Sequence, residues 1–215
     1  MTTIATASNS ISSEAMRFIE AARVPDSVPS GSWGLWTIAR QSVSDRQMPE
    51  AGWRMITTLG RMTMATMHLP YGDVVMEDSM LELSRHLPIW MRASGDVLVS
   101  GLGLGCVVRG LLASDRVTGI DVVEVDKTVL DVVGREFAGN PRVSMRLGDA
   151  RSVPWPGGKS WDFAWHDVWH EDGNGGPLAK MHVELLWRFR GMVRRGQGAW
   201  NFPRELKRIL PGIIG

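Results

Sequence analysis

The pattern of apolar and polar positions changes character near residue 94. Before that point the pattern is mixed. It contains a helical segment at 14–23 capped by Ser13, a candidate strand at 33–43, a stretch at 53–69 that suits helix or strand, a returning strand at 74–78, and a helical stretch at 79–92 that breaks near Pro88. Residues 1–93 are therefore predicted to form a small α+β extension with helices and a β-hairpin.

After residue 94, short β-branched runs alternate with amphipathic segments. The predicted strands are 96–100, 117–126, 142–150, 161–169 and 197–202, and the predicted helices are 106–114, 127–139, 177–193 and 204–210. Such alternation predicts right-handed βαβ units and a parallel sheet. Residues 94–215 are thus expected to form a Rossmann-like α/β domain with flanking helices and a short C-terminus. A ligand would bind beyond the carboxyl ends of its strands.

Composition narrows the class of protein only modestly. The formal net charge is +1, which does not select for polyanionic partners. Cys106 is the one cysteine, so disulfides within the chain and zinc sites of several cysteines are excluded, and a reducing cytoplasm is the expected location. The N-terminus does not resemble a secretory signal, and no uncharged apolar stretch suggests a membrane span.

The chain is unusually rich in tryptophan and methionine, with 10 and 13 residues respectively. These side chains suit either a large core or an aromatic-walled pocket for a flat or cationic ligand. The Trp- and Met-rich N-terminal region is also a candidate surface for a homodimer.

A glycine cluster lies between the first predicted strand and the first helix of the α/β domain. Gly101, Gly103 and Gly105 let the backbone bend sharply and let a ligand approach without side chains in the way. The following helix presents free N–H groups. The spacing G-x-G-x-G differs from the G-x-G-x-x-G of dinucleotide sites, which disfavours NAD and FAD. A plain tight turn is the alternative.

Acidic residues follow the next two strands. Glu124 and Asp126 end the second strand, and Glu124 lies at the distance from the glycines at which a carboxylate accepts hydrogen bonds from a ribose. Asp149 ends the third strand, where it suits the exocyclic amine of adenine. The alternatives are a solvated strand end for the pair and a turn cap for Asp149.

The fourth predicted strand ends in a cluster of polar residues that suits acid–base chemistry. Asp167 is expected above the sheet, where an aspartate can bind a substrate amine or act as a base. His166 and His170 are further catalytic candidates, with a structural role as the alternative for each. No partner cluster elsewhere supports a metal site at these residues, so no metal is expected.

Four motifs in order, VLVSGLGLG, VVEVDKTVLDVV, RLGDA and WDFAWHDVWHE, resemble the class I S-adenosylmethionine (SAM)-dependent methyltransferase superfamily. The VEVD segment is most similar to the spermidine synthase-type branch. The chain is also similar, over most of its length, to small methyltransferase-like proteins of phages and bacteria. The resemblance implies a Rossmann-like fold and SAM as the cofactor.

The resemblance also implies roles for single residues. Gly101, Gly103 and Gly105 would border the methionine and ribose portions of SAM, and Glu124 would bind the ribose hydroxyls. Asp149 would contact adenine with Ala150 beside it. In the branch, Asp167 matches the first acid of a D-x-x-D signature, and His170 replaces the second. The upstream segment would bring Glu77, Asp78 or Glu82 to the active site.

Two departures leave the reaction open. His170 stands where the branch has an acid, and Tyr71, the one tyrosine, leaves no set of tyrosines to line a polyamine channel. We therefore expect a SAM-dependent methyltransferase whose acceptor is a small molecule or a macromolecule. The alternatives are an aminopropyltransferase that uses decarboxylated SAM and a non-catalytic nucleoside-binding protein.

Overall fold

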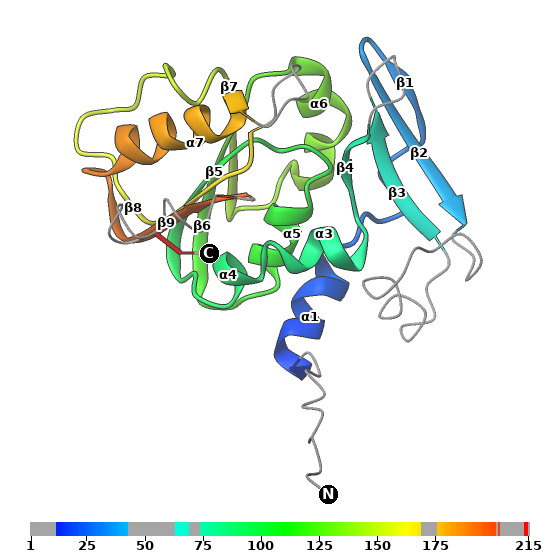
Figure 1. Cartoon of the computed structure of the whole chain (residues 1–215), viewed down its shortest axis with the longest axis horizontal. Coiled ribbons are helices and arrows are strands. Elements are labelled where there is room, and N and C mark those ends of the chain that lie inside the picture. The colour runs from blue at the N-terminus through cyan, green and yellow to red at the C-terminus, as the bar shows by residue number, and fades with distance from the viewer. Residues whose placement is uncertain are drawn as a thin grey trace, which may run out of the picture.

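A five-stranded parallel sheet forms the centre of the α/β domain (Figure 1). The computed structural model describes residues 12–42, 63–68, 74–168, 176–200, 202, 213 and 214. The strands are β5 (Gly95–Ser100), β6 (Val117–Glu124), β7 (Val143–Leu147), β8 (Trp161–His166) and β9 (Val193–Ala199). Their order is β7-β6-β5-β8-β9, and every neighbouring pair is parallel. The predicted Rossmann-like fold is confirmed.

This strand order creates a switch point between β5 and β8. From β5 the chain adds β6 and β7 on one side, and it then crosses back to add β8 and β9 on the other. The connections after β5 and β8 therefore leave the sheet in opposite directions and open a crevice at the carboxyl ends of the strands.

Helices cover both faces of the parallel sheet. The connecting elements are α5 (Cys106–Leu112), α6 (Lys127–Val132), the 3-10 helix η2 (Gly134–Phe137) and α7 (Gly176–Phe189). Alternate β5 residues face opposite sides: Val97 and Val99 pack in the cluster that holds α5, whereas Leu98 packs with Leu185 and Phe189 of α7. This alternation is the period-2 pattern of a strand buried on both faces.

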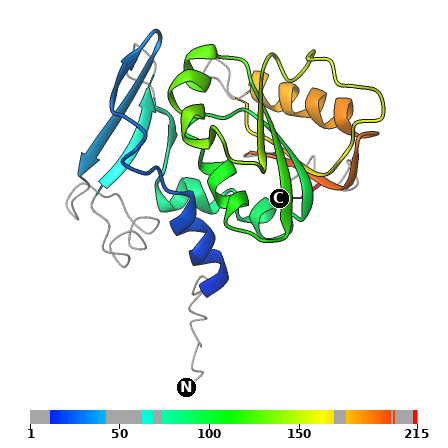
Figure 2. The same ribbon diagram turned by 180° about the vertical axis from the view of Figure 1, so that it is seen from behind.

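The N-terminal segment adds an antiparallel sheet of four strands that stands beside the α/β domain (Figures 1 and 2). The strands are β1 (Gly31–Trp33), β2 (Trp36–Ser42), β3 (Thr63–His68) and β4 (Val74–Glu77), paired in chain order. This sheet is larger than the predicted hairpin, because the chain ambiguous at 53–69 contributes β3 at its described end. Residues 53–62 lie outside the described ranges.

Short helices join the two sheets. α1 (Ser13–Ala22) buries Phe18 and Ile19 against the α/β domain and is capped by Ser12, one residue before the expected Ser13. The helical stretch predicted at 79–92 divides into α3 (Met80–Ser84) and α4 (Leu87–Trp90); the break lies at Arg85 and His86, and Pro88 stands in the first turn of α4. The side chain of Ser79 caps α3 by accepting the N–H of Glu82.

The helix predicted at 204–210 lies outside the described residues. Within the described part of the chain, no helix combines the length and the apolar character that a bilayer crossing requires.

Candidate functional site

A cavity of about 280 Å³ lies where the carboxyl ends of the parallel strands meet the N-terminal sheet. From the α/β domain it is lined by Gly101, Gly103, Glu124, Asp126, Asp149, Ala150 and Asp167, among others. From the N-terminal segment it is lined by Leu35, Trp36, Met67, Val75, Met76 and Glu82. The volume is near the lower end of the range for ligand pockets, roughly 300 Å³. Most of the predicted site residues thus share one cavity.

Two glycines of the loop after β5 allow close backbone approach inside the cavity. Gly101 has φ +92°, and a Cβ there would overlap the backbone oxygen of Asp167. Gly103 has φ +50°, and its Cβ would lie 2.6 Å from the sulfur of Met76. Any side chain at either position would therefore displace a neighbour. Gly105 begins α5 and does not line the cavity.

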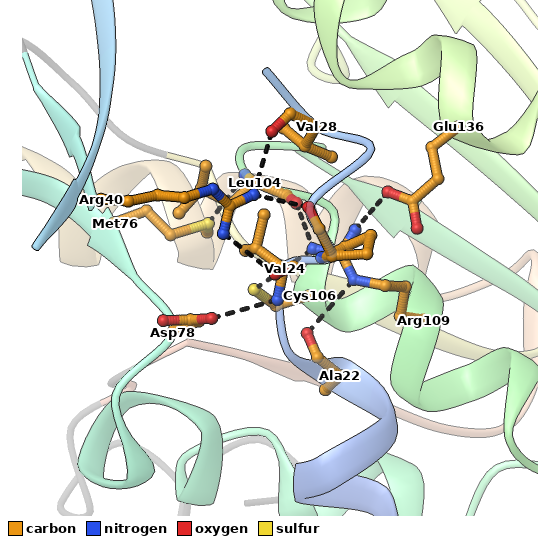
Figure 3. A network of polar contacts seen from close by, with 11 residues as sticks. Ala22, Val24, Val28, Arg40, Met76, Asp78, Leu104, Cys106, Arg109 and Glu136 are labelled. Carbon is orange, nitrogen blue, oxygen red and sulfur yellow. Dashed lines mark hydrogen bonds and ion pairs between the residues drawn. The ribbon is translucent and has the colours of Figure 1, made fainter. Parts of the chain in front are cut away.

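The peptide of Leu104, within the same loop, is held from both sides (Figure 3). Its N–H donates to Met76 Sδ on β4 at 3.0 Å, and its carbonyl accepts from Arg109 Nη2 on α5 at 2.5 Å. Arg109 also donates to the carbonyl of Ala22 in α1 and pairs with Glu136. The N-terminal segment and the glycine loop are therefore fixed to each other.

Glu124 points back from the end of β6 toward the glycine loop. One carboxylate oxygen accepts the N–H of Leu102 at 2.7 Å, and the other accepts the N–H of Asp126 at 2.8 Å. The residue is 7% exposed, and burial raises the pKa of its carboxyl. The two backbone bonds fix the carboxylate at the cavity wall beside Gly101 and Gly103.

Asp126 lines the cavity, but both of its oxygens have structural partners. One accepts the N–H of Thr128 at 2.7 Å and so caps α6. The other accepts the indole N–H of Trp36 at 2.5 Å, which ties the N-terminal sheet to the end of β6. Asp126 therefore joins the two walls of the cavity.

Asp149 and Ala150 follow β7 and line another part of the cavity. Asp149 accepts the backbone N–H of Arg151 and pairs with its guanidinium at 2.8 Å, which lowers the pKa of the Asp149 carboxyl. Ala150 is buried beside it. The turn-cap role considered for Asp149 is thus present, and its side chain still lies at the cavity.

Asp167 follows β8 and reaches the cavity next to Gly101. Its N–H donates to the carbonyl of Ser100, and its side chain is 9% exposed. Burial, with the nearby carboxylates of Glu82 and Glu124, raises the pKa of Asp167 to about 8. At neutral pH Asp167 is therefore mainly a neutral carboxylic acid.

Behind Asp167 lies a second buried titratable residue, His86. Its Nε2 is 3.8 Å from Asp167 Oδ2, and within the described ranges neither ring nitrogen of His86 nor this oxygen has a hydrogen-bond partner. Burial lowers the pKa of His86 to about 3, so the imidazole is neutral. A buried polar atom without a partner costs about 1–3 kcal/mol, and such a cost at a cavity often marks function.

The two histidines predicted next to Asp167 have different outcomes. His166 is fully buried on the opposite face of β8, where Nδ1 lies 2.9 Å from Ser100 Oγ and the ring stacks on Phe189. Burial lowers its pKa to about 3. His166, expected as a catalytic candidate, therefore does not line the cavity, because strand alternation turns it away. His170 lies outside the described residues.

Glu82 is one of the three upstream acids expected near the active site, whereas the sequence motifs do not single out His86, Trp36 or Met76. Glu82 lines the cavity and accepts from Arg85 at 2.6 Å and from the indole of Trp200. Burial raises the pKa of the Glu82 carboxyl. The spacing of four residues between Glu82 and His86, which suits one side of a helical segment, was a usable signal. In the described part of the chain, no group of three metal-ligating side chains gathers.

Comparison with curated proteins gives two partial matches. Spermine synthase of Arabidopsis thaliana is 34% identical over 98 residues, and the match covers 37% of this chain and 27% of that protein. Ribosomal RNA small subunit methyltransferase A of Parasynechococcus marenigrum (strain WH8102) is 36% identical over 64 residues, covering 30% and 21%. The chain thus spans about a quarter of the length of these relatives. No protein-family model matches it.

Among solved structures, TrmN of Thermus thermophilus aligns with a TM-score of 0.45 at 18% identity and covers 61% of this chain and 41% of that protein. Phosphoethanolamine N-methyltransferase 1 of Haemonchus contortus, solved with phosphoethanolamine and S-adenosylhomocysteine, aligns with a TM-score of 0.39 at 14% identity. It covers 52% of this chain and 23% of that protein.

Proposed function

We propose that the chain is a member of the class I SAM-dependent methyltransferase superfamily, that it binds SAM in the cavity and that it transfers the methyl group to an acceptor. The observation that carries the proposal is the carboxylate of Glu124, held by two backbone N–H groups at the cavity wall beside Gly101 and Gly103. A sharp backbone bend and an acid at the neighbouring strand end together suit a nucleoside.

The residues present fit an adenosine ligand. A carboxylate has about four acceptor positions, and the backbone N–H groups of Leu102, Gly103 and Asp126 leave at least one of them for a ribose hydroxyl. A Cβ at Gly101 or Gly103 would collide with Asp167 or Met76, so the backbone bend at this wall requires glycine. Asp149 and Ala150 lie in the same cavity, which supports their proposed place beside adenine.

SAM, when bound, supplies a methyl group on a sulfonium that is already activated for transfer. The protein then has to align the acceptor and take up its proton. Asp167 is the described side chain best placed for this role, because it lies at the cavity with one oxygen unbonded within the described ranges. We assign it as the base or amine-positioning residue.

The proposal is tested by calorimetric binding of SAM and S-adenosylhomocysteine to Glu124→Ala. Because one or two charge-assisted hydrogen bonds contribute about 1.5–3 kcal/mol each, we expect affinity to fall at least tenfold. Asp131→Asn, an exposed carboxylate on α6, is the matched control and should bind like the original protein. Unchanged affinity in a folded Glu124→Ala protein would refute the ribose assignment.

A second candidate is aminopropyl transfer from decarboxylated SAM. The cavity wall carries the carboxyl groups of Glu82, Glu124, Asp126, Asp149 and Asp167. Its one basic side chain among the described lining residues, Arg151, is already paired with Asp149. Such a wall favours a cationic ligand without a carboxylate.

Competition between SAM and its decarboxylated form separates the two candidates. Methyl transfer predicts that SAM binds at least as tightly, whereas aminopropyl transfer predicts preference for the decarboxylated form. Tight binding with no transfer to any cellular fraction would instead support a non-catalytic nucleoside-binding protein.

We also propose a cytoplasmic location and a homodimer. The single thiol, Cys106, is buried and free, which suits a reducing compartment. We place the dimer surface on the Trp- and Met-rich N-terminal segment.

A further inference from the structure

Two buried titratable side chains lie one behind the other at the cavity: Asp167 is next to the cavity and His86 is behind it. Asp167 lines the cavity, and His86 lies behind it, fully buried at the turn between α3 and α4. The ring of His86 is held between Trp90 on α4, with centroids 5.4 Å apart, and Trp165 on β8, at 5.9 Å. The imidazole is therefore fixed with one nitrogen facing the carboxyl group.

We propose that His86 is the positioning residue of Asp167, and that the pair holds one proton which moves from Asp167 Oδ2 to His86 Nε2 when a cation occupies the cavity. The O–H bond of the carboxylic acid breaks and an N–H bond forms on the imidazole, so no other reactant is needed. The remaining carboxylate is then the base that faces the acceptor. This inference rests on the proposed function for the identity of the cation.

The environment explains why the proton stays on Asp167 when the cavity holds no cation. Burial disfavours both the carboxylate and the imidazolium. The carboxylates of Glu82 on α3 and Glu124 on β6 further disfavour ionisation of Asp167, and Arg85 disfavours a positive charge on His86. Cys106 on α5 faces Asp167 as a neutral thiol, because burial raises its pKa to about 12.

A cation in the cavity changes this balance. It attracts the carboxylate form of Asp167, and the imidazolium of His86 attracts it from the other side at under 4 Å. Opposite charges at this separation commonly shift each pKa by about one to three units, downward for Asp167 and upward for His86, and the two shifts together act against the difference between about 8 and about 3. In the free protein Asp167 is therefore a neutral acid, and with a cation in the cavity it becomes a carboxylate that can act as a base.

The first test uses the free protein and follows the ring nitrogens of His86 by NMR. While Asp167 is protonated, Nε2 of His86 is the nitrogen that faces its O–H as an acceptor, so we expect the ring to carry hydrogen on Nδ1. As Asp167 loses its proton near pH 8, the ring should change to the Nε2–H form. His86→Gln assigns the signal among the five histidines.

Asp167→Leu should abolish this change, and Asp167→Asn replaces it if the leucine variant fails to fold. His182→Gln, which removes another buried imidazole on α7, should leave the change intact. A His86 spectrum that is the same at pH 6 and pH 9.5 in the original protein overturns the proposal.

The second test compares SAM with S-adenosylhomocysteine, which differ by the sulfonium methyl and its charge. At saturation, SAM should raise the apparent pKa of His86 by about one to three units relative to S-adenosylhomocysteine. Equal His86 spectra in both complexes would refute the transfer. Failure of SAM to bind, together with an intact tautomer change, would remove the proposed function and the assigned cation but leave the one-proton pair standing.

Discussion

The two walls of the cavity are built by different kinds of sheet and contribute different chemistry. The carboxyl edge of the parallel sheet contributes Glu124, Asp149 and Asp167, whereas the N-terminal antiparallel sheet contributes mainly apolar side chains such as Trp36 and Met76. At the first wall, Glu124 accepts the backbone N–H groups of Leu102 and Asp126, and Asp149 accepts that of Arg151. The second wall is held by long-range contacts, Trp36 to Asp126 and Met76 to Leu104.

The two walls therefore differ in how the sequence encodes them. A carboxylate that accepts a backbone N–H within its own turn, as Glu124 does from Asp126, can be recognised from a short motif. The N-terminal wall has no such motif, because its contacts join residues 28 to 90 positions apart. Breaking each wall in turn should therefore produce different defects.

The largest effect is expected from Gly101→Ala on the parallel-sheet wall. A positive φ costs a non-glycine residue about 1–2 kcal/mol, and displacing the backbone of Asp167 adds about 1–3 kcal/mol. We expect the free energy of unfolding to fall by about 2–5 kcal/mol and SAM affinity to be lost, measured by urea unfolding and calorimetry.

Gly139→Ala is the matched control for that prediction. Gly139 has φ +84°, but its Cβ would meet no described atom within 4 Å. It should cost only the conformational part, about 1–2 kcal/mol. Equal losses at the two positions would show that the close approach at Gly101 contributes nothing.

The next largest effect is a loss of stability in acid, which the buried histidines behind each wall should cause. His86 and His166 have pKa values lowered by burial to about 3, whereas an unfolded histidine titrates near about 6.5. Below pH 6.5 the unfolded state binds more protons, so stability is present above that pH and is lost as pH falls toward 3. Each residue should contribute about 1.4 kcal/mol per pH unit.

His166→Gln isolates this contribution on the parallel sheet. Asp167, whose pKa is raised, acts in the opposite sense, since its contribution is present at low pH and is lost as pH rises through about 8. Asp167 is present in both the variant and the original protein, so its contribution to the pH dependence cancels when their stabilities are compared. Urea unfolding at pH 7, 6 and 5 should show a shallower loss in the variant, and parallel curves would contradict the burial argument.

The smallest effect is expected from Trp36→Phe on the N-terminal wall. Losing the indole N–H bond to the partly exposed Asp126 should cost about 1–2 kcal/mol. Because this bond joins the sheets, hydrogen exchange should accelerate in β1 and β2 while β5 and β6 stay protected. Trp33→Phe, on the neighbouring strand, removes ring area but leaves the Asp126 bond, and similar acceleration there would show that the bond is not the tie.

Much of the parallel sheet was predictable because each strand carries its own apolar pattern. β5 to β9 were all expected, and the predicted positions of Glu124 and Asp167 at strand ends put both at the cavity. The side of the sheet that His166 faces was not predictable. Two adjacent residues face opposite sides, so the end of β8 must be known before the side chain of His166 or of Asp167 can be assigned to the cavity. The antiparallel sheet was underestimated because its pairing is set by residues far apart in the chain.

The order of strands and helices, the backbone bend at Gly101 and Gly103, and the acid at the end of β6 can be read from the amino-acid sequence alone. These are local properties, because propensity, strand periodicity and glycine conformation act over a few residues. The position of His86, 3.8 Å behind Asp167, and the contact of Met76 with the glycine loop are seen only in the folded protein. Those contacts arise from packing between separate elements, whose free energy depends on the whole fold.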